Sequence, residues 1–168
     1  KVHILNNAQN ARCPEDCGYC SQSAVTDAPL RPYPWKSKAE LVEEAKKAYA
    51  CGAFRYCMVA SGRGPADRQI DYLVDVVETI RAEVPVNICV SVGLLDEAKA
   101  RRLKQAGVDR FNHNLNTIEA FHPVICTTHT FRDRLTTIGH ARAAGLEICS
   151  GGIIGMGESD DDVIDLAM

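Results

Sequence analysis

The sequence has no long apolar run and no excess of charge of either sign. None of its apolar stretches is long enough to cross a bilayer, and no signal-peptide pattern is present, so we expect no membrane association. Its 19 basic and 22 acidic residues give a net charge of −3, which argues against nucleic acid as the main partner. Low-complexity segments and tandem repeats are also missing, which favours one ordinary globular domain.

Cysteine, in contrast, is abundant. The chain has eight cysteines among 168 residues, and its apolar fraction of 46% is ordinary for a globular protein. A disulfide framework suits small secreted domains that lack a core, but 168 residues are enough to bury one. Metal binding or catalysis is therefore the better interpretation for several of these cysteines.

Short β-like runs alternate with amphipathic helical segments along the chain. Ser37 and Glu40 form a predicted capping box at the start of one helix, and Gly107 and Gly145 follow the ends of two others. The predicted strands cover residues 2–5, 54–60, 86–92, 108–115 and 146–154. The predicted helices cover residues 37–51, 65–83, 96–106 and 130–144, and a further helix begins at residues 159–162.

This alternation predicts an α/β fold with a parallel sheet built of βα units. The chain holds about five of the eight units of a (β/α) TIM barrel, so we expect an incomplete barrel. The sequence stops inside a helix that has just begun, and we interpret residues 1–168 as the N-terminal part of a longer (β/α)8 domain. The alternative is a five-stranded doubly wound sheet.

Three of the cysteines, Cys13, Cys17 and Cys20, lie in one turn-prone loop at the spacing C-x3-C-x2-C. A structural zinc site usually has four ligands, and no fourth Cys or His follows at finger-like spacing. A 4Fe–4S cluster normally takes one thiolate per iron, so three thiolates leave one iron open to a small molecule. The spacing alone also occurs in zinc proteins, and both kinds of site stay open at this point.

The longer string CPEDCGYCSQSA, at residues 13–24, resembles the signature loop of the radical S-adenosylmethionine (SAM) enzymes, and among them the biotin synthase family. The resemblance covers residues 4–168 and continues through the strand cysteines and the strings NHNL and CSGGIIG. It implies that the three loop cysteines bind a 4Fe–4S cluster whose open iron chelates SAM. It also implies that Tyr19 belongs to this cofactor site.

Three further cysteines, Cys57, Cys89 and Cys149, each lie on a predicted strand. A single buried cysteine is often only a small hydrophobic residue. Cysteines on three of four successive strands instead favour a second metal site, provided that their side chains face inward. The resemblance implies a 2Fe–2S cluster on these three residues, with an arginine from a later strand, beyond Met168, as the fourth ligand.

A polar run, Asn112-His113-Asn114-Leu115-Asn116, ends one predicted strand. Because side chains alternate along a strand, the three asparagines are predicted to share a face, and His113 should point the other way into the core. Buried amides are costly unless they bind something. The resemblance implies that Asn112 contacts the ureido ring of the substrate and Asn114 the adenosyl group. Asn116 would contact the ribose hydroxyls, where the family often has aspartate.

Two further cofactor residues, Arg134 and Ile153, follow from the resemblance. Arg134 would pair with the methionine carboxylate of SAM, since a guanidinium binds a carboxylate bidentately, although the pattern alone favours a solvated helix arginine. Ile153, in the string GGIIGMGE, would pack on the adenine. Cys51 and Cys126 lie outside all of these patterns, and we interpret both as structural.

The resemblance implies an enzyme that inserts sulfur into dethiobiotin to form biotin. SAM cleavage would give a 5′-deoxyadenosyl radical that removes hydrogen from an unactivated carbon, and the 2Fe–2S cluster would donate the sulfur. A cytoplasmic location, an electron donor of the flavodoxin or ferredoxin type, and a homodimer of the full-length protein are also implied. Two alternatives remain: another radical SAM enzyme, such as a mutase or maturase, and a non-catalytic zinc-binding or iron-carrying module.

Overall fold

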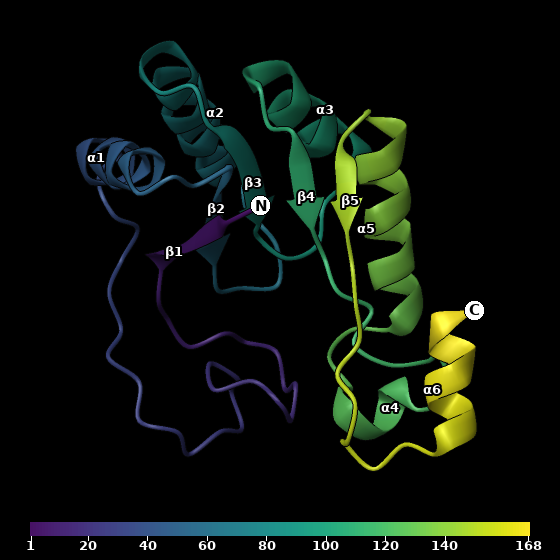
Figure 1. Ribbon diagram of the computed structural model, residues 1–168. Coiled ribbons are helices and arrows are strands. Elements are labelled where there is room, and N and C mark those ends of the chain that lie inside the picture. The colour runs from purple at the N-terminus through teal and green to yellow at the C-terminus, as the bar shows by residue number, and fades with distance from the viewer.

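A computed structural model describes residues 1–168 and contains one parallel sheet of five strands (Figure 1). The strands are β1 (His3–Gln9), β2 (Arg55–Ala60), β3 (Asn87–Ser91), β4 (Arg110–Asn112) and β5 (Glu147–Cys149). The helices are α1 (Lys38–Ala50), α2 (Asp67–Glu83), α3 (Glu97–Ala106), α4 (His122–Ile125), α5 (Phe131–Ala143) and α6 (Asp160–Ala167). None of these helices combines the length and the apolar character needed to cross a membrane.

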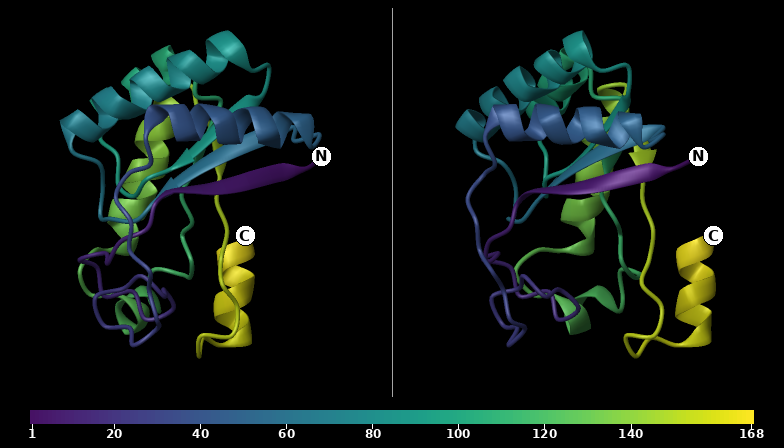
Figure 2. Two further views of the ribbon diagram at one scale, coloured as in Figure 1. Left: turned by 90° about the vertical axis from the view of Figure 1, so that its left-hand side faces the viewer. Right: turned by 60° about the vertical axis from the view of Figure 1, so that its left-hand side comes forward.

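The strands lie side by side in chain order, and every neighbouring pair is parallel. Helices α1, α2, α3 and α5 pack against one another in the same order and cover one face of the sheet (Figure 1, Figure 2). A doubly wound sheet instead carries helices on both faces and reverses its strand order at a switch point. Sequential strands with the helices outside are the arrangement of a (β/α) barrel. The predicted incomplete barrel is therefore confirmed, and the doubly wound alternative is wrong.

The hydrophobic core lies between the sheet and this helical layer. Tyr56 and Met58 on β2, Ile88 and Val90 on β3, and Phe111 on β4 are each at most 1% exposed. They alternate along their strands with residues that point to the opposite, inner face of the sheet. Full burial of one such aliphatic or aromatic side chain contributes about 1.5–3 kcal/mol. The outer face thus stabilises the fold and leaves the inner face free to carry polar and cysteine side chains.

Several helices begin and end at residues that the sequence already indicates. The Ser37 hydroxyl accepts a hydrogen bond from the backbone N–H of Glu40, and the Glu40 carboxylate accepts one from the N–H of Ser37, which completes the predicted capping box. Asp96 caps α3, and Gly107 ends it in the left-handed conformation at φ 108°. Because such a cap contributes about 1 kcal/mol, these helix boundaries follow the sequence closely.

The strands depart further from the prediction than the helices. β4 ends at Asn112 instead of running to residue 115, and the chain turns through Asn116, whose φ of 71° does not occur in extended strands. β5 stops at Cys149, whereas β1 continues to Gln9. Helix α4 has no counterpart among the predicted elements, because four residues are too few to show helical periodicity.

Candidate active site

The cysteine loop lies beside α4 at the carboxyl ends of the strands (Figure 1, Figure 2). The backbone N–H of Gly18 donates to the carbonyl of Ile125 in α4 at 2.9 Å. The carboxylate of Asp16 accepts hydrogen bonds from the backbone N–H groups of Thr127 and Thr128 at 2.9 and 3.2 Å. These contacts fix the loop at the end of the sheet where barrel enzymes carry their active sites.

A cavity of about 240 Å³ lies between this loop and the ends of the strands. Its wall comes from the loop, from the turns after β2 and β3, from the segment after β4, and from α5. Only 5 of its 17 lining residues are hydrophobic, so the cavity suits a polar ligand. Among the sequence-predicted ligands, the cavity gathers Cys13, Cys17, Tyr19, Cys20, Asn112, Asn114, Asn116 and Arg134.

The three loop cysteines all line this cavity, but their sulfurs are too far apart to share one ion. Of all the groups of three metal-ligand residues, only Cys17, Cys126 and His129 have ligand atoms within 4.8 Å of one another. A cluster presents a separate iron to each thiolate, so the loop fits a cluster better than a single ion. Burial raises the pKa of Cys13, and burial together with the neighbouring Cys126 raises that of Cys17 to about 12. Metal binding would therefore release protons from both thiols.

Arg134 of α5 is buried against the cavity wall at 9% exposure, so its interpretation as a solvated helix residue is wrong. Its Nη1 donates to the carbonyl of Asn114 at 2.8 Å and its Nη2 to the hydroxyl of Tyr19 at 3.1 Å. With its amide oxygen turned toward this group, Asn116 accepts from both Nη atoms at 3.2 Å and from the Tyr19 hydroxyl. None of these partners is charged, and the Nε–H has no partner. A buried guanidinium in such surroundings favours an anionic ligand.

The three asparagines of the polar run all line the cavity, but strand geometry places only Asn112 there. Asn116 reaches the wall through its turn, whose backbone is held by β5 and the segment after it. The N–H of Asn116 donates to the carbonyl of Gly151 at 3.0 Å, and its carbonyl accepts from the N–H of Ile153 at 2.8 Å. The chain after β5 thus sets the position of Asn116.

His113 and Ile153 differ in how far the structure agrees with the sequence. His113 is buried and stacks on Phe111, with ring centroids 5.9 Å apart, as expected of a core histidine. Burial lowers the pKa of His113 to about 3, and its ring also forms part of the cavity wall. Ile153 holds Asn116 through its backbone, but it is not among the residues that line the cavity.

The strand cysteines lie on the inner face of the sheet, opposite the apolar core. Cys57 and Cys89 are direct neighbours in the register of β2 and β3, and Cys149 on β5 is the neighbour of Asn112 on β4. A hydrogen bond between the first two thiols lowers the pKa of Cys57 and raises that of Cys89. Arg55, which is 3% exposed, also favours the thiolate of Cys57. Thiols are soft donors of the kind that bind metal centres, although the three strand sulfurs do not all lie within 4.8 Å of one another.

A further buried group, formed by Glu15, Cys126 and His129, lies next to the loop. The carboxylate of Glu15 is hydrogen-bonded to Nδ1 of His129 and pairs with Arg63 at 3.2 Å. Burial raises the pKa of Glu15, but hydrogen bonds, chiefly from His129, outweigh it and hold that pKa below its ordinary value. Cys126 is buried, as a structural cysteine would be, but its sulfur lies 3.7 Å from that of Cys17. The spacing Cys126-x2-His129 is the only sequence signal that points to this group.

Comparison with known protein families explains the loop and the fold together. The profile of the Radical SAM superfamily matches residues 10–168. The chain belongs to the radical SAM superfamily. Membership implies a 4Fe–4S cluster and SAM as cofactors.

Several biotin synthases are similar to this radical SAM chain. It is 52% identical to that of Acaryochloris marina over 166 residues, which cover 99% of the chain and 48% of the relative. It is 52% identical to that of Magnetococcus marinus over 167 residues, which cover 99% of the chain and 52% of the relative. It is 49% identical to that of Bacillus subtilis over 167 residues, which cover 99% of the chain and 50% of the relative. The radical SAM chain thus spans about half the length of the curated relatives that it matches.

Solved structures share the fold of this radical SAM chain at low sequence identity. Methylornithine synthase (PylB) superposes with a TM-score of 0.83 at 18% identity, over 96% of this chain and 47% of that one. The FeFe-hydrogenase maturase HydG from Carboxydothermus hydrogenoformans superposes with a TM-score of 0.77 at 24% identity, over 93% of this chain and 37% of that one. At such identities the likeness concerns the fold alone.

Proposed function

We propose that this chain is part of a biotin synthase, which inserts sulfur into dethiobiotin to form biotin. The similar biotin synthases, at 52% and 49% identity, support this over a mutase or a maturase, since the maturase HydG is only 24% identical. The three strand cysteines support the same proposal, because a second metal centre held by them could donate the sulfur.

One observation carries the proposal: Asn112 stands between the two sets of cysteines. Its side chain lines the cavity that the loop cysteines share, and in the sheet it is the neighbour of Cys149. Its amide nitrogen makes only a long contact, 3.5 Å to the carbonyl of Cys149, so most of its hydrogen-bonding capacity is free. A substrate held by Asn112 would lie between a radical source on one side and a sulfur donor on the other.

The residues take distinct roles in this proposal. The loop cysteines Cys13, Cys17 and Cys20 would hold the 4Fe–4S cluster, and Cys57, Cys89 and Cys149 would hold a 2Fe–2S cluster. Tyr19, Asn114, Asn116 and Arg134 would bind SAM, with Ile153 as a backbone support of Asn116. When bound, these cofactors supply the electron that cleaves SAM and the sulfur that enters the substrate.

The protein's own part is binding and exclusion of water. Arg134 offers its guanidinium to the carboxylate of SAM, and the bonds from Tyr19 and Asn116 hold that guanidinium in place. Asn112 would orient dethiobiotin through its ureido ring. An electron donor of the flavodoxin or ferredoxin type, a homodimer of the full-length protein and a cytoplasmic location complete the proposal.

Three cysteine variants of the full-length protein test the two metal sites separately. Cys17→Ala should abolish both 5′-deoxyadenosine and biotin formation, because it removes a ligand of the radical-generating site. Cys89→Ala should keep 5′-deoxyadenosine formation but lose biotin, because only the sulfur donor is affected. Cys51→Ala, at an exposed helix end, should change neither product. Undiminished biotin formation by Cys89→Ala would contradict the assignment.

A further inference from the structure

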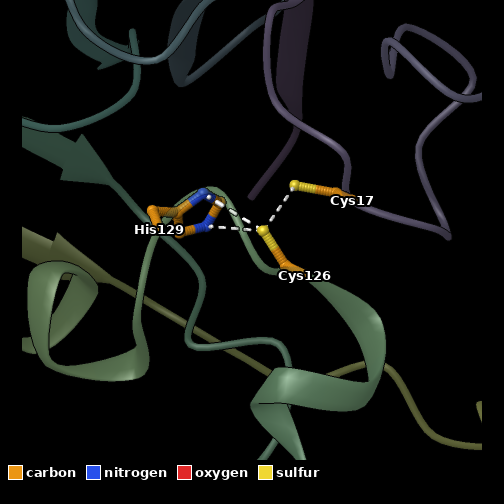
Figure 3. A group of neighbouring side chains, drawn as sticks. All are labelled: Cys17, Cys126 and His129. Carbon is orange, nitrogen blue, oxygen red and sulfur yellow. Dashed lines mark hydrogen bonds between the residues drawn. The ribbon is translucent and has the colours of Figure 1, made fainter.

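Cys126 is a buried cysteine that none of the proposed cofactor sites uses. It directly follows α4 and is 3% exposed. Its sulfur lies 3.7 Å from Sγ of Cys17, one of the proposed cluster ligands, which is itself only 7% exposed (Figure 3). This distance allows a hydrogen bond between the two sulfurs, since a thiol is a weak donor and sulfur a weak acceptor. A disulfide would instead need the sulfurs to approach to about 2.05 Å.

The imidazole of His129 packs against the same sulfur but is poorly placed to accept its hydrogen. The sulfur of Cys126 lies 3.3 Å from Nδ1 and 3.7 Å from Nε2 (Figure 3). A donor aligned with the in-plane lone pair of one ring nitrogen would lie much farther from the other nitrogen, so neither lone pair points at the sulfur. Nδ1 is also bonded to the carboxylate of Glu15, and because a carboxylate can only accept, Nδ1 carries the hydrogen of that bond. The S–H of Cys126 therefore needs another acceptor.

The hydroxyl of Thr128 is the other polar neighbour, 3.6 Å from the sulfur of Cys126. Its hydrogen is directed to a carboxylate oxygen of Glu15 at 2.9 Å or of Asp16 at 3.0 Å, and its oxygen already accepts from the backbone N–H of Asp16 at 3.2 Å. Cys17 would carry a negative charge as a cluster ligand, and hydrogen bonds to ionised acceptors are about twice as strong as those between neutral groups. The thiolate of Cys17 is thus the favoured acceptor for Cys126.

We propose that Cys126 donates an S–H···S hydrogen bond to Cys17 and raises the reduction potential of the cluster that Cys17 holds. The proposal rests on the 4Fe–4S site of the proposed function. Cys17 stays a ligand of the cluster, and Cys126 binds no iron itself. The role of Cys126 is therefore that of a hydrogen-bond donor beside the cluster.

The direction of the effect follows from charge. Reduction adds one electron to the cluster, and part of the added negative charge resides on the ligand sulfurs. A hydrogen-bond donor beside one of these sulfurs stabilises the reduced cluster more than the oxidised one, which makes reduction easier. Hydrogen bonds to the sulfurs are among the features that set the potential of iron–sulfur clusters. A cysteine that the sequence indicates only as structural would thus help an electron donor to reduce the cluster.

A redox titration of the full-length protein, followed by EPR after anaerobic reconstitution with iron and sulfide, tests the hydrogen bond. Cys126→Ala and Cys126→Val both remove the donor, and valine also fills the space so that no water can replace it. In both variants the equilibrium constant for reduction should fall about threefold or more, which corresponds to about 30 mV for a one-electron couple. Cys126→Ser keeps a donor and should titrate at or above the potential of the unaltered protein. Cys51→Ala, at an exposed helix end, should leave the potential unchanged.

Iron and sulfide analysis of each variant shows whether the cluster is present before the potentials are compared. If the two donor-free variants hold the cluster at the unaltered potential, or if the potential of Cys126→Ser falls with theirs, the hydrogen bond does not tune the cluster. Loss of the cluster from both donor-free variants also overturns the proposal, because all three loop thiolates remain in each of them. An unaltered protein that takes up no 4Fe–4S cluster refutes the proposed function instead, so the two failures give different results.

Discussion

At the scale of single residues, Arg134 carries the charge that the proposed SAM site needs. Its bonds go to a carbonyl and a hydroxyl, so no negative charge offsets the guanidinium. In the full-length protein, Arg134→Gln should weaken SAM binding roughly tenfold or more, because hydrogen bonds to charged groups contribute about 1.5–3 kcal/mol. Calorimetric titration with SAM measures this. The control Arg132→Gln changes an exposed arginine on the same helix and should bind SAM as tightly as the unaltered protein does. If Arg134→Gln binds SAM with the same affinity as Arg132→Gln, Arg134 does not bind SAM.

Asn112 provides the corresponding test on the substrate side. Asn112→Ala removes a donor and an acceptor whose loss should cost about 1–3 kcal/mol, and hence weaken dethiobiotin binding by about tenfold or more. SAM affinity in the same variant is the internal control, and it should change much less because Arg134 and Tyr19 remain. If the dissociation constant of dethiobiotin stays the same, Asn112 does not hold the substrate.

The residues that the sequence could predict are those that stand close together in motifs. Cys13, Cys17 and Cys20 lie within eight positions, so their shared site needs no knowledge of the fold. Glu15 and His129 are 114 positions apart, and only the packing of the loop on α4 brings them together. No motif in the sequence links the two residues, so their contact could not be predicted before that packing was known. Arg134 lies on the buried face of α5 with Thr137, Ile138 and Ala141, but its bond to the Asn114 carbonyl depends on a turn that helical periodicity does not predict.

At the scale of elements, helices were easier to predict than strands for a physical reason. Helix boundaries are set by caps such as Ser37 and Asp96, which act locally and can be read from the sequence. A strand ends where its neighbour stops pairing. The predicted strand over residues 108–115 ends early because its regular pairing with β5 stops at Asn112 and Cys149, and only an isolated bridge between Asn116 and Gly152 follows. The number and order of the βα units were nevertheless predictable, since they depend on alternation alone.

Gly93 lies in the loop after β3 and packs against the loop that carries Arg63. It has a φ of 84°, and a Cβ there would lie 2.4 Å from the carbonyl oxygen of Arg63, the residue that holds Glu15. Gly93→Ala should therefore lower the free energy of unfolding by more than about 1 kcal/mol, the cost of the left-handed conformation alone. Gly139→Ala, at an open position in α5, should instead raise it by about 0.5–1 kcal/mol. Urea unfolding of the full-length protein measures the free energy of unfolding of both variants. If the two substitutions change that free energy by the same amount, the steric explanation for Gly93 is wrong.

At the scale of the whole molecule, the sheet has two free edges. β1 pairs only with β2, and β5 pairs only with β4. Free edges offer unpaired backbone groups to other chains, and parallel sheets are normally covered on both faces. Here helices cover the outer face (Figure 2), while the inner face carries exposed side chains such as Leu5, which is 63% exposed. The 168-residue chain by itself therefore presents surfaces that favour self-association.

This arrangement leads to a prediction for the 168-residue chain expressed alone. It should aggregate or stay partly unfolded and form no biotin, which light scattering after size exclusion and thermal melting would measure. Leu5→Lys places a charge on the β1 edge and should shift the population toward monomer, because edge lysines oppose strand pairing. Val124→Lys, at a similarly exposed position on α4, should not shift it, because Val124 is not on a sheet edge. If the unaltered 168-residue chain is instead a monodisperse monomer that melts cooperatively, the prediction is wrong. The core between the sheet and the helices would then be enough to stabilise the fold, and neither the sheet edges nor the inner face would need a partner.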